Sequence, residues 1–322
     1  MHRQSTRLSA RLPTPLRRLV APLEHRGIVA TYELHDRVLS NRTARRRHAH
    51  RPPALDEVQQ RILSELHANG YATLPFAELV SDGPLREEIE VQGAAFIDAT
   101  KTGLARETEG GADVGLRRRP GKEFLVRANS FDGVRLGQDD AWLQACLSSR
   151  LLDLANAYLR LWSKLSYVDL WYTAPQPAAA DRVASQLWHF DFDDKHLLKA
   201  FLYLSDVGES AGPFEYVAGS QPGGRYHEVR PWRPMAYGRV PEEDVSRRVP
   251  AEAVKTFAAP RGTLILCNTS GLHRGGFATK KPRVLATATY CSPASLAALS
   301  RRNYTFETAT LAVGSAATYA VS

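Results

Sequence analysis

His189 and Asp191 form an H-x-D pair in the stretch SQLWHFDFDD, residues 185–194, which otherwise carries large apolar side chains. On an extended strand, residues i and i+2 point to the same face, so this imidazole and this carboxylate would project together. A carboxylate buried without a partner costs several kcal/mol. The pair therefore has three interpretations: an exposed sheet edge, a hydrogen-bonded pair in the core, or two ligands of a metal site.

His273 is the candidate for a third ligand. It follows the apolar stretch 263–267 and precedes a glycine pair that allows close backbone approach. Two histidines and one carboxylate make the facial triad that holds Fe(II) with open coordination positions, as in non-haem oxygenases. The sequence therefore predicts His189, Asp191 and His273 as metal ligands and as catalytic residues.

Arg283 stands ten residues after His273 and opens the apolar stretch RVLATATYC. Arginine is the side chain best suited to hold a carboxylate through two parallel hydrogen bonds. A buried arginine at this place needs an anionic partner, and a cosubstrate carboxylate would be one. The alternative is an exposed residue at the end of a strand.

The elements that must position these residues change character near residue 160. Before it, apolar residues recur at helical spacing, and we expect helices at 54–69, 84–99 and 141–162, short strands at 71–76 and 123–131, and a loop at 103–121. After it, the period is two, and Gly- and Pro-rich turns separate the candidate strands 164–173, 185–192, 198–207, 213–220, 262–268 and 283–291. Helices followed by short strands favour an α+β fold with a β-sandwich or barrel.

Composition places the chain among globular proteins, since 43% of its 322 residues are hydrophobic and 24% are charged. No apolar run reaches the ~18 residues of a membrane span. Cys146, Cys267 and Cys291 are far apart, which argues against a disulfide framework and fits a reducing compartment such as the cytoplasm.

The net charge of +8 is concentrated in residues 1–53, where 12 arginines face three acids. The other 269 residues hold 30 basic and 31 acidic side chains, so a nucleic-acid groove on this body is not expected. Residues 1–53 are interpreted as a flexible basic arm, or alternatively as an organelle-targeting segment. The Pro pair at 52–53 marks the boundary to a single domain at 54–322.

The stretch WHFDFDDKHLLKAFLYLSDVGESAGPFEYVAGSQ, followed by GLHRGG and KPRV, resembles the phytanoyl-CoA dioxygenase family of Fe(II)/2-oxoglutarate-dependent oxygenases. The likeness extends to VQQRILSELHANGYATLPF and covers most of residues 54–293. It implies a double-stranded β-helix, or cupin-like jelly roll, at about 161–293, with a helical layer at 54–160 packed on the sheet.

The resemblance also implies roles for particular residues. His189, Asp191 and His273 would bind Fe(II), and Arg283 would hold the distal carboxylate of 2-oxoglutarate. Further cosubstrate contacts are assigned to four residues: Gln186, Phe201, Lys122 and Arg127. The reaction would consume O2, release succinate and CO2, and hydroxylate a small organic molecule, free or linked to CoA or a carrier.

Three neighbouring polar residues are not predicted to bind the metal. Asp193, Asp194 and His196 are interpreted as solvated loop residues, or as partners that orient the ligands. Two other function classes stay open: a cupin-like metal enzyme that does not use 2-oxoglutarate, and a non-catalytic jelly-roll binding protein. The sequence leaves the substrate and the oligomeric state undetermined.

Overall fold

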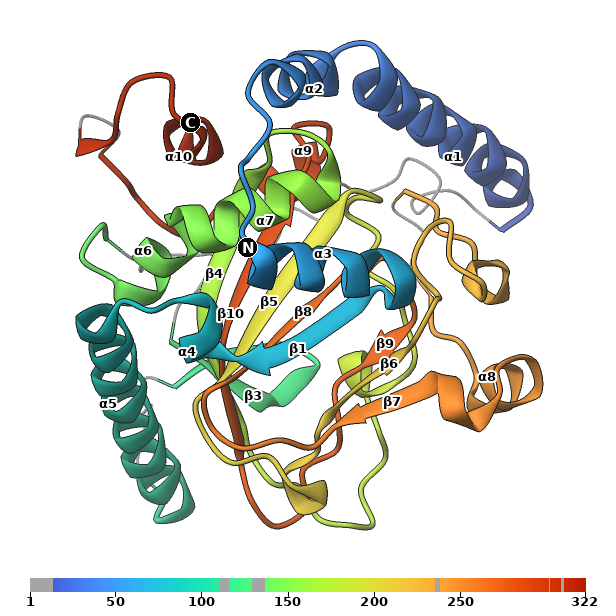
Figure 1. The fold of residues 1–322 in the computed structure, drawn as a ribbon. Helices are drawn as coiled ribbons and strands as arrows, with labels where there is room; N and C mark the ends of the chain where they lie inside the picture. The colour runs from blue at the N-terminus through green and yellow to red at the C-terminus, as the bar shows by residue number, and fades with distance from the viewer. Residues whose placement is uncertain (1–13, 111–115, 129–136, 235–237, 301, 308–309) are drawn as a thin grey trace.

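Two antiparallel β-sheets form the centre of the molecule, and helices cover the outer face of the larger one (Figure 1). The computed structural model describes residues 14–110, 116–128, 137–234, 238–300, 302–307 and 310–322. None of the helices in these ranges has the length and apolar character needed to cross a bilayer.

The larger sheet has seven strands in the order β1-β8-β5-β10-β4-β3-β2. Its strands are β1 (Tyr71–Pro75), β2 (Arg117–Arg119), β3 (Lys122–Arg127), β4 (Lys164–Thr173), β5 (Leu197–Tyr203), β8 (Thr263–Cys267) and β10 (Arg283–Cys291). The smaller sheet has the order β7-β6-β9, with β6 (Phe214–Val217), β7 (Val254–Phe257) and β9 (His273–Arg274). His189 adds a bridge to His273 at its edge. This arrangement is the expected jelly roll.

Alternation along the central strands separates two environments. On β10, Val284, Ala286, Ala288 and Tyr290 belong to the main apolar core under the helices. Leu285, the residue between the first two, belongs instead to the apolar cluster between the sheets. This period of two is the pattern that the sequence showed after residue 160.

The main core lies between the larger sheet and the helices that precede β4. These helices are α3 (Glu57–Asn69), α4 (Phe76–Leu79), α5 (Gly83–Thr108), α6 (Ala141–Leu147) and α7 (Ser149–Leu159). The side chain of Asp56 caps the start of α3, and Gly70 ends it in the left-handed region at φ 80°. The helices that follow β4 in the chain are α8 (Glu242–Arg248), α9 (Leu296–Leu299) and α10 (Ala316–Val321).

Several boundaries differ from the expectation. The helix expected at 141–162 is two helices, because Ser148 adopts an extended conformation with ψ 152° between α6 and α7. Residues 185–192 are not a regular strand: a short 3-10 turn at Ala184–Gln186 leads into the bridge at His189. Helix α5 continues to Thr108, into the segment expected as a loop. Residues 111–115 of that loop and 129–131 of the expected strand 123–131 lie outside the described residues.

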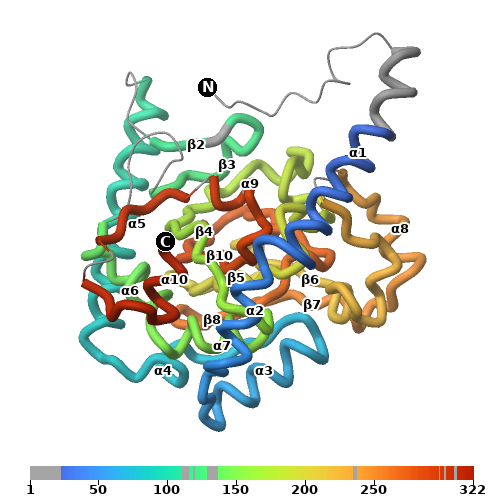
Figure 2. Tube along the Cα trace, turned by 90° about the horizontal axis from the view of Figure 1, so that it is seen from above, coloured from blue at the N-terminus to red at the C-terminus, as the bar shows by residue number. Residues whose placement is uncertain are grey.

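The basic segment before residue 54 differs from the flexible arm expected there. From Thr14 it forms α1 (Thr14–Arg37) and α2 (Ser40–His50), which lie over one end of the two sheets (Figures 1 and 2). Tyr32, Asp36, Asn41 and Ala44 are buried. Residues 1–13 lie outside the described residues, and the boundary of the main domain at residue 54 stays a prediction.

Candidate metal centre

Backbone hydrogen bonds between two segments bring His189 and His273 side by side. The N–H of each histidine donates to the carbonyl of the other, at 3.0 and 2.9 Å, and the ring centroids are 4.3 Å apart. Two residues on, the N–H of Asp191 donates to the carbonyl of Thr269 at 2.7 Å. The backbone itself therefore aligns the segment that carries Asp191 with the segment that carries His273.

The three predicted ligands converge: their ligand atoms lie within 4.8 Å of one another. His273 Nε2 is 3.9 Å from Asp191 Oδ2, too far for a direct hydrogen bond. This separation leaves room for a metal ion between Nε2 and Oδ2. Among the described residues, this is the one group of three or more His, Cys, Asp or Glu side chains close enough to hold a metal.

The orientation of both imidazoles suits metal binding. His189 Nδ1 is 2.8 Å from the carbonyl oxygen of Leu187, and His273 Nδ1 is 3.0 Å from that of Gly271. A carbonyl oxygen only accepts, so each Nδ1 carries the proton and donates it. Each Nε2 then keeps its lone pair for a metal ion. The two histidines are thus fixed in the same tautomer, each by a hydrogen bond to the carbonyl oxygen two residues before it.

The charges in the site also favour a cation. Burial lowers the pKa of His273 to about 4 and that of His189 well below its ordinary value, so both rings are neutral at pH 7. Burial alone would raise the pKa of Asp191, but Lys199 and the two histidines outweigh it and lower the pKa overall. The donor set is therefore two neutral imidazoles and one carboxylate.

Lys199 is a member of the site that was not predicted. Its Nζ lies 2.6 Å from Asp191 Oδ2, and both side chains line a cavity of about 140 Å³. The other lining residues are Lys122, Leu125, Arg127, Ser166, Tyr167, Trp171, Asp193, Leu197, Thr289 and Ala298. A lysine in the apolar stretch LLKAFLY, on the face that alternates inward, was the available signal.

Arg283 is buried at the start of β10 with 7% of its surface exposed. Its Nη1 donates to the carbonyl of Gly212, whereas its buried Nε has no hydrogen-bond partner among the described residues. No carboxylate of the described residues forms an ion pair with it. A Cβ at Gly275, two residues after His273, would lie 3.5 Å from Nη2. A buried guanidinium of this kind fits a small-molecule carboxylate.

The other four predicted cosubstrate contacts lie in different surroundings. Phe201 packs on Phe214, with centroids 5.2 Å apart, and the Phe214 ring lies 5.8 Å from that of His273. Lys122 shares the cavity with Asp191. Arg127 is held in a buried ion pair by Asp169 at 2.7 Å.

The side-chain amide of Gln186 is hydrogen-bonded on both sides by protein groups. Its Nε2 donates to Gln176 Oε1 at 2.7 Å, and its Oε1 accepts from the N–H of Val183 at 3.0 Å. The roles of Gln186, Phe201, Lys122 and Arg127 toward a cosubstrate stay predictions. Lys122 and Arg127 both line the cavity beside Asp191, but Arg127 is already paired with Asp169. Phe201 is linked to His273 by the Phe214 ring. Phe201 and Lys122 therefore have the positions that suit such a role best.

Comparisons with known proteins complete the description of the site. No protein-family model matches the chain, and no curated protein matches its sequence. EctD from S. alaskensis, solved with bound Fe, is 18% identical over 75% of this chain and 78% of that chain, with a TM-score of 0.47. The non-haem, α-ketoglutarate-dependent carbocyclase SnoK from nogalamycin biosynthesis is 17% identical over 74% and 86%, with a TM-score of 0.48. HygX from Streptomyces hygroscopicus, solved with nickel, 2-oxoglutarate and hygromycin B, is 16% identical over 74% and 87%, with a TM-score of 0.41.

Proposed function

We propose that this protein is a non-haem Fe(II)- and 2-oxoglutarate-dependent oxygenase, of the phytanoyl-CoA dioxygenase type, that hydroxylates a small organic molecule. The observation that carries the proposal is one combination of residues. A buried triad of His189, Asp191 and His273 lies in the same fold as Arg283, a buried cation to which the described residues supply no carboxylate. The triad fits Fe(II), and the guanidinium fits the distal carboxylate of 2-oxoglutarate.

The protein residues have distinct tasks in this proposal. The two Nε2 atoms and Asp191 would hold the metal on one face and leave the opposite face for cosubstrate and O2. Arg283 would bind the distal carboxylate of the cosubstrate through two parallel hydrogen bonds, and so select its length and fix its orientation. Bound iron and 2-oxoglutarate would supply the oxidising chemistry, with succinate and CO2 as co-products.

The cavity beside Asp191 is the proposed substrate site. It combines the apolar surfaces of Leu125, Trp171 and Leu197 with the ammonium groups of Lys122 and Lys199. When a metal ion engages Asp191 Oδ2, Lys199 has to share or give up that oxygen, because its Nζ lies only 2.6 Å away. Its ammonium would then turn to a substrate or to water in the cavity.

Anaerobic titration of the metal-free protein with Fe(II) and 2-oxoglutarate tests the proposal. We expect a visible metal-to-ligand charge-transfer band that needs both components. His189→Ala should abolish the band, whereas His227→Ala, a histidine outside the triad, should keep it. Fe(II) binding without an effect of 2-oxoglutarate would favour a cupin-like metal enzyme instead. No metal binding at all would favour a non-catalytic jelly roll.

A further inference from the structure

The segment that follows Asp191 is held in place by helix α1. Tyr32 on α1 is buried, and its hydroxyl donates to Asp194 Oδ1 at 2.5 Å and accepts from the N–H of Lys195 at 3.1 Å. Asp194 is fully buried, three residues after the predicted ligand Asp191. A side chain more than 150 positions away in the sequence thus fixes this turn.

Asp194 also joins the turn to the segment that carries His273. Its Oδ2 accepts from the N–H of Ser292, just after β10, at 2.7 Å. Its backbone carbonyl accepts from Ser270 Oγ at 2.7 Å, three residues before His273. Asp194 thus contacts α1, the residue after β10 and Ser270. A shift of Asp194 would therefore move both the segment that carries Asp191 and the segment that carries His273.

A second contact from α1 fixes the residues next to Asp194. Asp36 receives Lys195 Nζ at 2.7 Å and lies 2.9 Å from His196 Nε2. Asn41, at the start of α2, donates to Asp36 at 2.7 Å and to Ser292 Oγ at 3.0 Å. Asp36, Asn41 and Ser292 are buried, whereas Lys195 and His196 are partly exposed. The buried polar groups depend on one another, because each would be costly without its partner.

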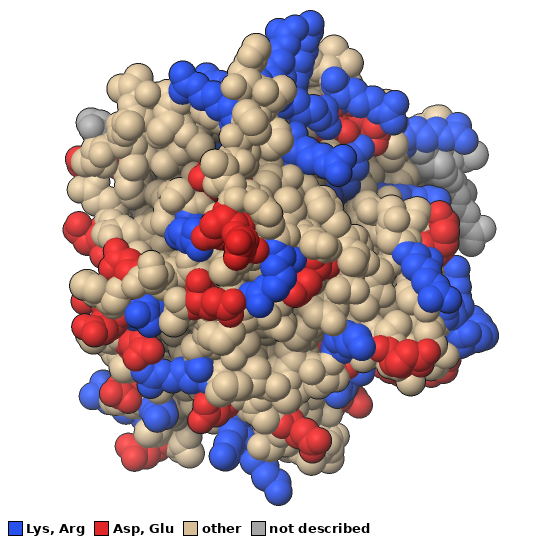
Figure 3. All heavy atoms as spheres, in the orientation of Figure 1, with Lys and Arg blue, Asp and Glu red and all other residues tan. Residues whose placement is uncertain are grey.

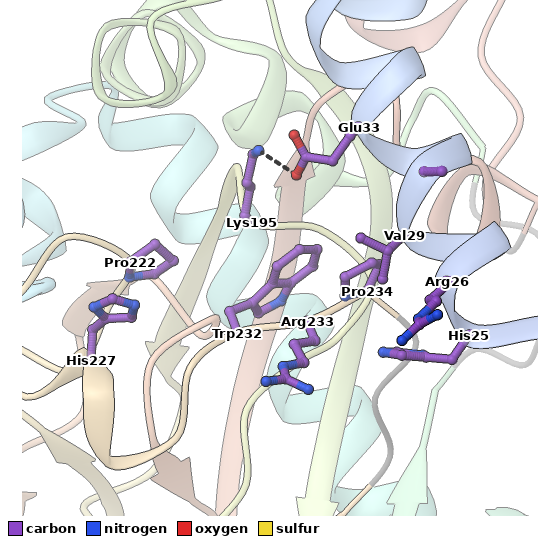
Figure 4. A pocket seen from close by; sticks show the side chains of 11 residues that line it. His25, Arg26, Val29, Glu33, Lys195, Pro222, His227, Trp232, Arg233 and Pro234 are labelled. Carbon is purple, nitrogen blue, oxygen red and sulfur yellow. Dashed lines mark hydrogen bonds and ion pairs between the residues drawn. The ribbon is translucent and has the colours of Figure 1, made fainter. Parts of the chain in front are cut away.

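A third contact reaches the backbone of the ligand itself. Trp232 Nε1 donates to the carbonyl oxygen of Asp191 at 2.8 Å. The ring of Tyr32 packs against the Trp232 indole with centroids 5.1 Å apart. Figure 4 shows the indole in the groove beside α1, with Val29 and the Glu33–Lys195 ion pair next to it. Trp232 is thus held between α1 and Asp191.

The apolar core depends little on α1. Of α1 and α2, only Ala44 belongs to the main core among the described residues, and that residue is on α2. From residue 23 of α1 onward, where side chains are described, the contacts with the body are mainly polar and converge on residues 191–196. Loss of these contacts should therefore loosen residues 191–196, which include Asp191, and leave the jelly roll folded.

We infer that α1 is a structural part of the metal centre, in which Tyr32 is a positioning residue that holds Asp191 in ligating geometry through Asp194 and Trp232. This inference rests on the metal site of the proposed function. In metalloproteins, mutation of a residue that orients a metal ligand lowers metal affinity by roughly 10- to 100-fold. Coupling of this kind is reciprocal, so a bound metal favours docking of α1 by the same factor.

The first test measures Co(II) affinity of the metal-free protein by visible absorption, without cosubstrate. We expect Tyr32→Phe and Trp232→Phe each to weaken Co(II) binding roughly 10-fold or more. Tyr226→Phe is the matched control, because no hydrogen bond of the Tyr226 hydroxyl is found among the described residues, and it should bind like the wild type. Thermal midpoints of the metal-free variants separate this effect from unfolding: a midpoint near that of the wild type with weakened Co(II) binding supports the inference.

The second test uses the arginines of α1 and α2 as trypsin sites. Co(II) should slow cleavage within residues 14–51 of the wild type, and this protection should fall in Tyr32→Phe by the same factor as the Co(II) affinity. Unchanged Co(II) affinity in both variants would overturn the inference. Wild-type protein that binds no Co(II) would instead overturn the proposed metal site, so the two failures are distinguishable.

Discussion

At the scale of single residues, burial of the two triad histidines makes folding depend on pH. An unfolded histidine titrates near 6.5, whereas the pKa of His273 is about 4 in the fold and that of His189 is also lowered. Below pH 6.5 the unfolded chain therefore binds more protons than the native state. Stability of the metal-free protein should rise with pH between about 4 and 6.5, and it is lost as the pH falls through that window.

His273→Gln removes one of these two titrations. From pH 7 to pH 5, the protonation of His273 in the unfolded chain should cost about 2 kcal/mol of unfolding free energy. We expect the variant to lose about 2 kcal/mol less than the wild type over this interval, as measured by urea unfolding of the metal-free proteins. His227→Gln is the control and should behave like the wild type. An identical pH dependence of His273→Gln and wild type would contradict the prediction.

A buried ion pair and an exposed one should differ strongly in what they contribute. Asp169 is fully enclosed and holds Arg127 at 2.7 Å, while Glu90 and Arg261 pair with half of each side chain exposed. Asp169→Asn removes the carboxylate that pairs with this buried guanidinium and should destabilise by about 3 kcal/mol. Glu90→Gln should cost less than about 1 kcal/mol. Denaturant midpoints of the two variants check this, and equal losses would count against it.

The residues of the site were predictable to different degrees. His189, Asp191 and His273 could be found because their types and spacing describe a ligand set. Lys199 had a weaker signal, an inward-facing lysine in an apolar strand, and Asp194 was left open between a solvated residue and a partner that orients the ligands. Their partners could not be predicted, since these are set by the packing of segments far apart in the chain. Tyr32 and Asp194, 162 positions apart, meet only because α1 folds back over the end of β5 and β10.

At the scale of elements, the connection from β9 to β10 passes very close to the turn before β6. A Cβ at Gly276 would lie 2.1 Å from the carbonyl oxygen of Pro213, so the site admits glycine only. The neighbouring Gly212, in the left-handed region at φ 66°, accepts the hydrogen bond of Arg283. This crossing therefore sets the distance between the strand of His273 and the strand of Arg283.

Gly276→Ala should force these two segments apart. We expect a loss of roughly 1–3 kcal/mol in unfolding free energy, in the range found for overpacked sites. We also expect weaker 2-oxoglutarate binding, because Arg283 shifts with Gly212. Gly208→Ala is the matched control, since its Cβ would meet no atom within 4 Å. The prediction fails if both variants have the same midpoint and the same cosubstrate affinity in titrations.

The elements themselves were predictable where apolar periodicity reports on the core. The stretches of β4, β5, β8 and β10 alternate, and α3 has a regular apolar stripe with a capping box. Helices α1 and α2 were missed because they dock mainly through charged and polar groups. For example, Asp36 on α1 pairs with Lys195 Nζ at 2.7 Å, and the Arg47 guanidinium on α2 lies 4.9 Å from the Tyr319 ring centroid. Arginine-rich composition does not distinguish such a docked helix from a solvated arm.

At the scale of the whole molecule, charge is distributed unevenly. Figure 3 shows Lys and Arg side chains gathered along the edge where Figure 1 places α1 and α2, with mixed acidic and basic residues over the rest of this face. Some of these arginines are used inside the fold, as Arg45 and Arg47 show. Arg45 joins α2 to Asp36 of α1, and Arg47 packs on Tyr319, so these two arginines hold the helices to each other and to the body.

The thermal stability of the whole protein should report on binding of both the metal ion and 2-oxoglutarate. A ligand that binds only the folded state at 100 times its Kd adds about 2.7 kcal/mol to the free energy of unfolding. For a chain of this length, that corresponds to a rise of several degrees in Tm. Co(II) alone, and then 2-oxoglutarate in the presence of Co(II), should each raise the Tm of the metal-free wild type.

The variant Arg283→Gln should separate the rise in Tm caused by Co(II) from the rise caused by 2-oxoglutarate. Its triad is intact, so the Co(II) shift should remain. If loss of the guanidinium weakens 2-oxoglutarate binding roughly 100-fold, the same concentration adds only about 0.4 kcal/mol, and the second shift nearly disappears. Arg261→Gln, at an exposed arginine that pairs with Glu90, should keep both shifts. A full 2-oxoglutarate shift in Arg283→Gln would show that the carboxylate is held elsewhere, and Lys122 would then be the next residue to substitute.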